Sequence, residues 1–136
     1  LKEATDKNLE LLKEGKTFEN KNPMLSSLFR ESIQPYMISW VKYDPATLLK
    51  NLKCKVLIVQ GRRDIQVKVE DAELLHKVRP SATLLFIDDM NHVLKSVSTP
   101  SKTDNIKTYS DPTLPIHTLL VQEIIHFIQP IRTLHQ

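Results

Sequence analysis

Glycine is scarce in this sequence: its 136 residues include only two, Gly15 and Gly61, which lie far apart. The G-x-S-x-G nucleophile elbow, the G-x-G-x-x-G dinucleotide-binding turn and the G-x-x-x-x-G-K-[ST] phosphate loop each need glycines a few positions apart. All three motifs are therefore excluded from these residues.

Cysteine and long apolar runs are equally scarce. The single cysteine, Cys54, excludes an intrachain disulfide and a cysteine-cluster metal site, and its place just before an apolar stretch predicts a buried, unreactive thiol. No apolar run approaches the roughly 18 to 20 residues of a membrane-spanning helix, and the first residues show no signal-peptide pattern. Because the sequence starts without methionine, we expect it to begin inside a longer chain, and cytoplasmic and periplasmic locations both stay open.

Charged residues are not concentrated in any one part of the sequence. The 19 basic and 16 acidic residues are scattered along the chain and leave a net charge of +3. Without a basic stripe interleaved with aromatic residues, nucleic acid is not an expected partner. The histidines outside the motif discussed below have no spacing typical of metal ligands, except His117 and His126, which are nine apart; structural or solvent-facing roles are favoured, so neither a metal nor a cofactor is expected. These are His76, His117, His126 and His135.

Apolar spacing predicts an α/β protein with two parts, a helical N-terminal segment over residues 1–44 and an α/β segment over 45–136. The expected helices cover residues 2–14, 24–32, 35–41, 44–51, 70–78 and 116–128. Two short apolar runs, 55–60 and 83–87, are predicted strands; with the helix between them they form a βαβ unit, which should be parallel. The polar stretch 96–115 is predicted to be a long loop, either a lid segment or disordered.

Two polar residues follow the two predicted strands. Asp64 closes the turn Gly61-Arg62-Arg63-Asp64 after the first strand, and His92 follows the second. In open parallel sheets the ligand crevice lies outside the carboxyl ends of the strands, so we expect these side chains to be neighbours. In a Ser-His-acid triad the acid orients the imidazole through Nδ1, and Nε2 takes the nucleophile's proton. The pattern therefore indicates half of a catalytic triad.

Simpler interpretations of the same residues stay open. Asp64 could cap the turn after the strand, which is a frequent use of aspartate, and His92 could be a surface loop residue. Asp88 and Asp89 are alternative acids just before His92, although their adjacency to it favours a role in shaping the turn.

Three segments stand in a characteristic order: residues 56–64 (VLIVQGRRD), residues 82–87 (ATLLFI) and Met90-Asn91-His92. This combination resembles the C-terminal third of the α/β-hydrolase fold. Residues 28–40, together with residues 90–95 (MNHVLK), are similar to a poorly characterised hydrolase subfamily with a helical insertion. The resemblance covers nearly the whole chain, most specifically residues 55–95, and it implies that the N-terminal segment is part of a helical cap.

The resemblance also implies a function. The chain would be the C-terminal portion of a serine hydrolase that cleaves an ester or amide bond in a small-molecule or peptide substrate, without a cofactor. Asp64 would be the triad acid and His92 the catalytic base. Tyr36 and Trp40 in the cap and Lys95 near the site are candidate substrate-binding residues. Asn91 stands where many members of the family have glycine, which asparagine can replace because it also adopts left-handed backbone angles.

The triad nucleophile is expected upstream of these residues, because the family's chain order is Ser, acid, His. The chain alone should then be inactive. Two strands are too few for a well-covered parallel sheet, so we expect an exposed strand edge that pairs with a second copy, a swapped element or the N-terminal helices. The alternative from another class is a non-catalytic binding or assembly module in which Asp64 and His92 are vestigial.

Overall fold

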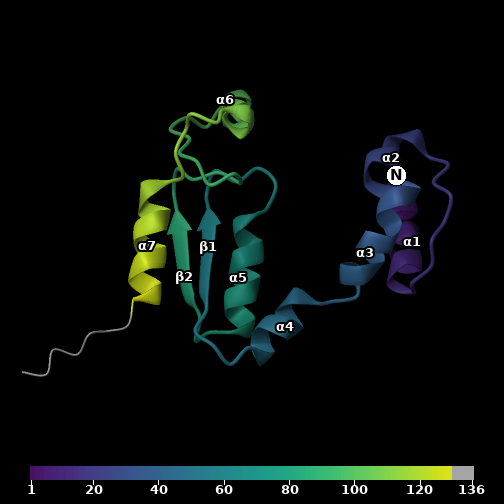
Figure 1. The fold of residues 1–136 in the computed structure, drawn as a ribbon, viewed down its shortest axis with the longest axis horizontal. Helices are drawn as coiled ribbons and strands as arrows, with labels where there is room; N and C mark the ends of the chain where they lie inside the picture. The colour runs from purple at the N-terminus through teal and green to yellow at the C-terminus, as the bar shows by residue number, and fades with distance from the viewer. Residues whose placement is uncertain (130–136) are drawn as a thin grey trace, which may run out of the picture. The chain divides into compact units, whose positions relative to one another are not determined.

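The computed structural model describes residues 1–129 (Figure 1). The chain divides into two compact units, Leu1–Leu48 and Leu49–Gln136. The predicted boundary after residue 44 lies just before helix α4 (Pro45–Asn51), whereas the division between the units falls within that helix. Among the described residues, no helix is long and apolar enough to cross a membrane.

The N-terminal unit is helical and has its own small apolar core. Its elements are α1 (Lys2–Lys13), η1 (Pro23–Leu25), α2 (Ser26–Phe29), η2 (Glu31–Ile33) and α3 (Gln34–Val41). The buried side chains of Leu12, Leu25, Phe29 and Met37 form the core. Gly15 ends α1 with a φ of 76°, the left-handed angle that glycine adopts at low cost.

The helix predicted over residues 24–32 is present only in short pieces: it is broken at Arg30, whose ψ of 140° is extended. The break has a side-chain cause. The fully buried Gln34 donates from Nε2 to the carbonyl of Phe29 at 2.8 Å, while its Oε1 accepts from the N–H of Phe18 at 2.8 Å. The amide of Gln34 thus takes a carbonyl that a continuous helix would use itself, and the last turn cannot propagate.

The second unit confirms the predicted parallel βαβ arrangement. Strand β1 (Leu57–Gly61) pairs in parallel with β2 (Thr83–Ile87), and helix α5 (Val69–Val78) connects them. Leu57 lies opposite Thr83 at one end of the ladder and Gly61 opposite Ile87 at the other. Helices α5 and α7 (Thr118–Ile128) lie on opposite sides of the two strands in Figure 1. The fold is mixed α/β with a two-stranded parallel sheet in the described residues.

Alternation along the strands explains why a helix covers each face of the sheet. Ile58 packs with Ala72 of α5, and Ile87, on the neighbouring strand, packs with Leu120 of α7. Successive strand residues point to opposite faces, so a run that is apolar at every position requires cover on both sides.

Two predictions about irregular segments are wrong. Cys54 is exposed rather than buried, because it precedes the first residue of β1 by three positions and lies in an irregular stretch. Residues 96–115 are not simply a loop, since they contain α6 (Lys102–Lys107) and the turn η3 (Thr108–Ser110). Ser101 begins α6 as its N-cap, with Oγ accepting from the N–H of Asp104 at 3.2 Å.

Candidate active site

The carboxyl ends of the two strands are locked together by backbone contacts. The N–H of Arg62 donates to the carbonyl of Ile87 at 2.9 Å, and that of Arg63 donates to the carbonyl of Met90 at 3.0 Å. Gly61 makes this possible: a Cβ at this position would lie 2.1 Å from the carbonyl oxygen of Met90. The glycine is therefore required for the close approach of these two segments, and this approach brings Asp64, three residues after Gly61, towards the loop that carries His92.

Asp64 uses its two carboxylate oxygens for different tasks. Oδ1 accepts from the N–H of Gln66 at 2.8 Å and from that of Val67 at 2.9 Å, which closes a turn around the side chain. Oδ2 lies 3.0 Å from Nδ1 of His92. The capping role and the contact with the histidine, which stood as alternatives in the sequence, are thus both present in one side chain.

Partial burial by itself raises the pKa of Asp64, but the N–H groups of Val67 and Gln66 and the His92 ring outweigh it. The net result is a pKa below the usual aspartate value. The carboxylate is therefore ionised across the neutral pH range, in the form that accepts a hydrogen bond from Nδ1–H of His92.

His92 is oriented on one side and open on the other. Its side chain is 39% exposed, against 9% for Asp64. With Nδ1 on the carboxylate, Nε2 has no hydrogen-bond partner among residues 1–129. An imidazole held at Nδ1 and open at Nε2 can accept a proton from an incoming hydroxyl and return it, which is general base and then general acid chemistry.

The alternative acids have other partners. Asp88 lies 2.9 Å from Nε of Arg62, whose guanidinium stacks on the ring of Phe86, while Asp89 accepts from Nε2 of His117 at 2.8 Å. The contact with His117 also holds the pKa of Asp89 below its usual value. Of these three acids, Asp64 is the one that contacts His92.

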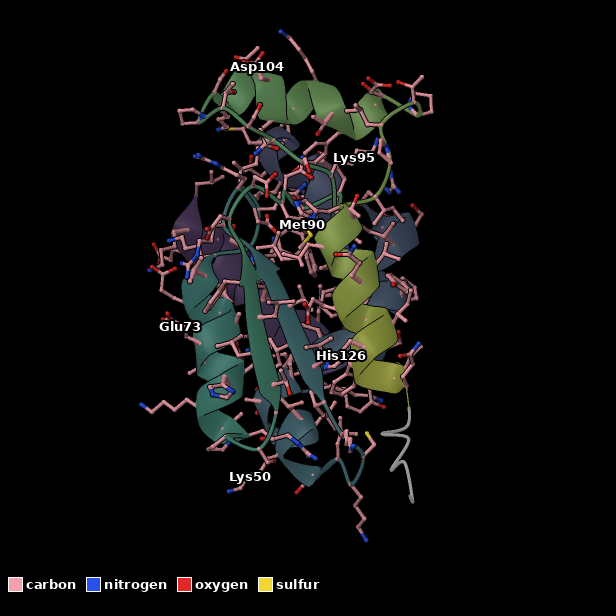
Figure 2. The ribbon with its side chains drawn as sticks, turned by 90° about the vertical axis from the view of Figure 1, so that its left-hand side faces the viewer. Lys50, Glu73, Met90, Lys95, Asp104 and His126 are labelled. Carbon is pink, nitrogen blue, oxygen red and sulfur yellow. The ribbon has the colours of Figure 1, made fainter. Side chains whose placement is uncertain are left out.

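Lys95 lies close to the site, but its ammonium group is already hydrogen-bonded to backbone carbonyls. Its Nζ donates to the carbonyl of Thr108 at 3.0 Å and to that of Asp111, so the ammonium holds the chain after α6. Figure 2 shows Met90 and Lys95 between the strand ends and α6, which carries Asp104.

The other two predicted substrate-binding residues belong to the N-terminal unit. Tyr36 and Trp40 lie on α3 with their rings 6.4 Å apart in an edge-on contact, and both are exposed, at 71% and 49%. The structure thus pairs the two aromatic side chains with each other.

Asn91 has a role that the sequence did not predict. It does not have a left-handed backbone, since Leu94 is the non-glycine residue in the described chain with positive φ, at 61°. Its side chain is 1% exposed and bonds to Asn105 of α6, which is 3% exposed. The sequence could have pointed to Asn91, because a polar side chain directly beside His92 is a candidate for positioning it. Asn105 could not have been found in this way, because it lies in a stretch of polar residues.

Among residues 1–129, no three His, Cys, Asp or Glu side chains gather closely enough to hold a metal ion. Comparison of the chain with family models, with curated proteins and with solved structures gave no match.

Proposed function

We propose that this chain carries the acid and the base of a Ser-His-Asp triad, in a serine hydrolase of the α/β-hydrolase fold that cleaves an ester or amide bond. The observation that carries the proposal is the pair at the strand ends. Oδ2 of Asp64 lies 3.0 Å from Nδ1 of His92, the carboxylate is held by two backbone N–H groups, and Nε2 is open.

In this proposal each group has one task. The ionised Asp64 keeps the His92 proton on Nδ1 and stabilises the imidazolium that forms when Nε2 accepts the proton of a serine hydroxyl. The serine oxygen then attacks the carbonyl carbon, and His92 returns the proton to the departing alcohol or amine. A fixed carboxylate needs little reorganisation during these steps, which favours catalysis.

The nucleophile must come from elsewhere in the protein. Among residues 1–129 no serine, threonine or cysteine side chain bonds to Nε2 of His92, and the two glycines exclude a nucleophile elbow. We infer that a G-x-S-x-G segment outside this sequence supplies the serine, with the oxyanion-binding N–H groups beside it.

The test uses the full-length gene product and a fluorophosphonate probe, which labels activated serines. We expect one labelled serine within G-x-S-x-G, and labelling lost in His92→Ala. His126→Ala is the matched control, because His126 is an exposed histidine on α7 (Figure 2). The control should label like the natural protein.

Two results would overturn the proposal: a full-length protein without such a serine, or labelling that persists unchanged in His92→Ala. Either one would favour the second candidate, a non-catalytic binding or assembly module in which the Asp64–His92 pair only stabilises the loops at the strand ends.

A further inference from the structure

The two loops that carry the candidate acid and base are bridged by one buried side chain. Asn105 of α6 donates from Nδ2 to the carbonyl of Arg63 at 2.6 Å and accepts at Oδ1 from Nδ2 of Asn91 at 3.0 Å. Arg63 immediately precedes Asp64, and Asn91 immediately precedes His92. One amide, 3% exposed, thus contacts the residue before each member of the pair.

The orientation of both amides follows from backbone groups. The N–H of Lys95 can only donate, so the Asn91 atom 3.0 Å from it is Oδ1, and Nδ2 points to Asn105 and to Oγ1 of Thr108. The carbonyl of Arg63 can only accept, so Asn105 must present Nδ2 to it and Oδ1 to Asn91. The chain of bonds has one self-consistent direction, and reversing either amide breaks it.

Further contacts hold η3 and the chain after it, directly following α6, against the same two loops. Lys95 donates to carbonyls after α6, as described above, and Nε2 of Gln66 bonds to the hydroxyl of Tyr109 at 3.2 Å. Gln66 lies in the turn closed by Asp64, so η3, which directly follows α6, is attached to the loop of the acid as well as to the loop of the base.

We propose that Asn105 is a positioning residue, which sets the distance and angle between Asp64 and His92 by joining their loops through α6. The physical reason is that a buried amide with both ends satisfied allows one spacing, and any drift of a loop leaves a polar group unpaired. The geometric inference stands independently of the reaction, whereas its effect on catalysis rests on the function proposed above.

The experiment reads the imidazole of His92 directly. In the full-length natural protein, nitrogen-15 spectra at a pH at which the His92 ring is neutral should show the proton on Nδ1, as a carboxylate partner requires. Asn105→Asp keeps the side-chain shape but sets a carboxylate oxygen against the carbonyl of Arg63. Asn105→Ser is smaller and leaves room for a bridging water. We expect the Nδ1–H signature to be lost in the first variant and reduced in the second.

Thr103→Ala, on the exposed side of the same helix, is the control and should keep the natural spectrum. A purely structural role would lower stability in the Asn105 variants without changing the ring nitrogens. Either Asn105 variant, folded and with the natural His92 spectrum, overturns the inference.

The full-length enzyme supplies a second measurement. Asn105→Ser should lower kcat about 10- to 100-fold with little change in KM, the size of effect expected from misplacing a catalytic group by about 1 Å. An unchanged kcat in an active enzyme contradicts the positioning role. An inactive natural protein contradicts the proposed function instead, and the His92 spectra still decide the role of Asn105.

Discussion

At the scale of single residues, Asp64 shows how one side chain joins a local and a long-range contact. Oδ1 accepts from two N–H groups within three positions in the chain, while Oδ2 reaches His92 in a different loop. The local turn holds the carboxylate in place, so the second oxygen is presented to the imidazole without further ordering.

This division of labour predicts the effect of Asp64→Asn. With its oxygen still accepting from Gln66 and Val67, the new amide must turn its NH₂ group towards Nδ1 of His92. Nδ1 must then accept, so the neutral ring carries its proton on Nε2. We expect nitrogen-15 spectra to show this inverted tautomer. A spectrum that still shows the proton on Nδ1 would mean that the two oxygens of Asp64 are not used as described.

The lowered pKa of Asp64 predicts a pH dependence of stability. A carboxyl group whose folded pKa is depressed contributes stability above its unfolded pKa, about 3.9, and loses it as pH falls through the folded value. Denaturant unfolding should therefore show Asp64→Asn less stable at about pH 5 by about 1.5 to 3 kcal/mol, the usual range for a hydrogen bond to a charged group. The gap to the natural chain should narrow towards pH 2, and a constant gap would contradict the assignment.

At the scale of secondary-structure elements, contacts at both ends of β1 hold the strand in place, and the contact at its carboxyl end shapes the candidate site. Arg79, the C-cap residue of α5, bonds through its guanidinium to the carbonyls of Leu49, Leu52 and Cys54 and so holds the segment that leads into β1. At the other end of β1, Gly61 lets the strand touch the chain at Met90.

Gly61→Ala should therefore destabilise the sheet and move Asp64 away from His92. A methyl group 2.1 Å from a backbone oxygen forces the strand ends apart, at a cost of about 1 to 3 kcal/mol or more. The matched control is Gly15→Ala, where nothing lies within 4 Å of the added Cβ and only the positive φ costs about 1 to 2 kcal/mol.

Unfolding curves would measure both glycine variants, and His92 spectra would distinguish them. Only Gly61→Ala should disturb the ring nitrogens of His92, because Gly15 lies in the other unit. An unperturbed His92 spectrum in Gly61→Ala would show that the close contact between Gly61 and Met90 does not determine how His92 lies relative to Asp64.

Apolar spacing predicted most elements close to their observed bounds. The strands, α5 and α7 are recognisable because one or both faces must be apolar along their whole length. Helix α6 was missed, since its six residues (KTDNIK) contain a single apolar side chain and no period. Its position depends on Asn105 and on Lys95 from a neighbouring loop, and contacts of that kind leave no pattern in the local sequence.

At the scale of the whole molecule, apolar surface stays exposed in the α/β unit. Each strand has one neighbour in the described residues, and α7 presents apolar side chains on the side away from the sheet as well. The exposed residues on α7 are Leu119, Val121, Ile124, Ile125 and Ile128. Surfaces of this kind on a small unit favour association.

The chain on its own should therefore self-associate. We expect sedimentation velocity to show a mass that rises with concentration, and the double variant Val121→Glu and Ile125→Glu to suppress the rise, because both side chains are more than 40% exposed. Thr103→Ala serves as the control here too. A chain that stays monomeric at high concentration would contradict the expectation that its open edge and helix face need cover.

The sequence by itself determined the strand, helix, strand order of the βαβ unit, the parallel pairing of its two strands, and the placement of Asp64 and His92 at the same end of the sheet. These features follow from apolar period and chain direction, which are local properties. Tertiary structure alone decided that the two side chains lie 3.0 Å apart, that Asn105 joins their loops, and that Cys54 is exposed. Those outcomes depend on contacts between residues that are far apart in the sequence. In this chain the contacts are single hydrogen bonds and the close approach that Gly61 allows because it has no Cβ, and neither produces a periodic pattern in the sequence.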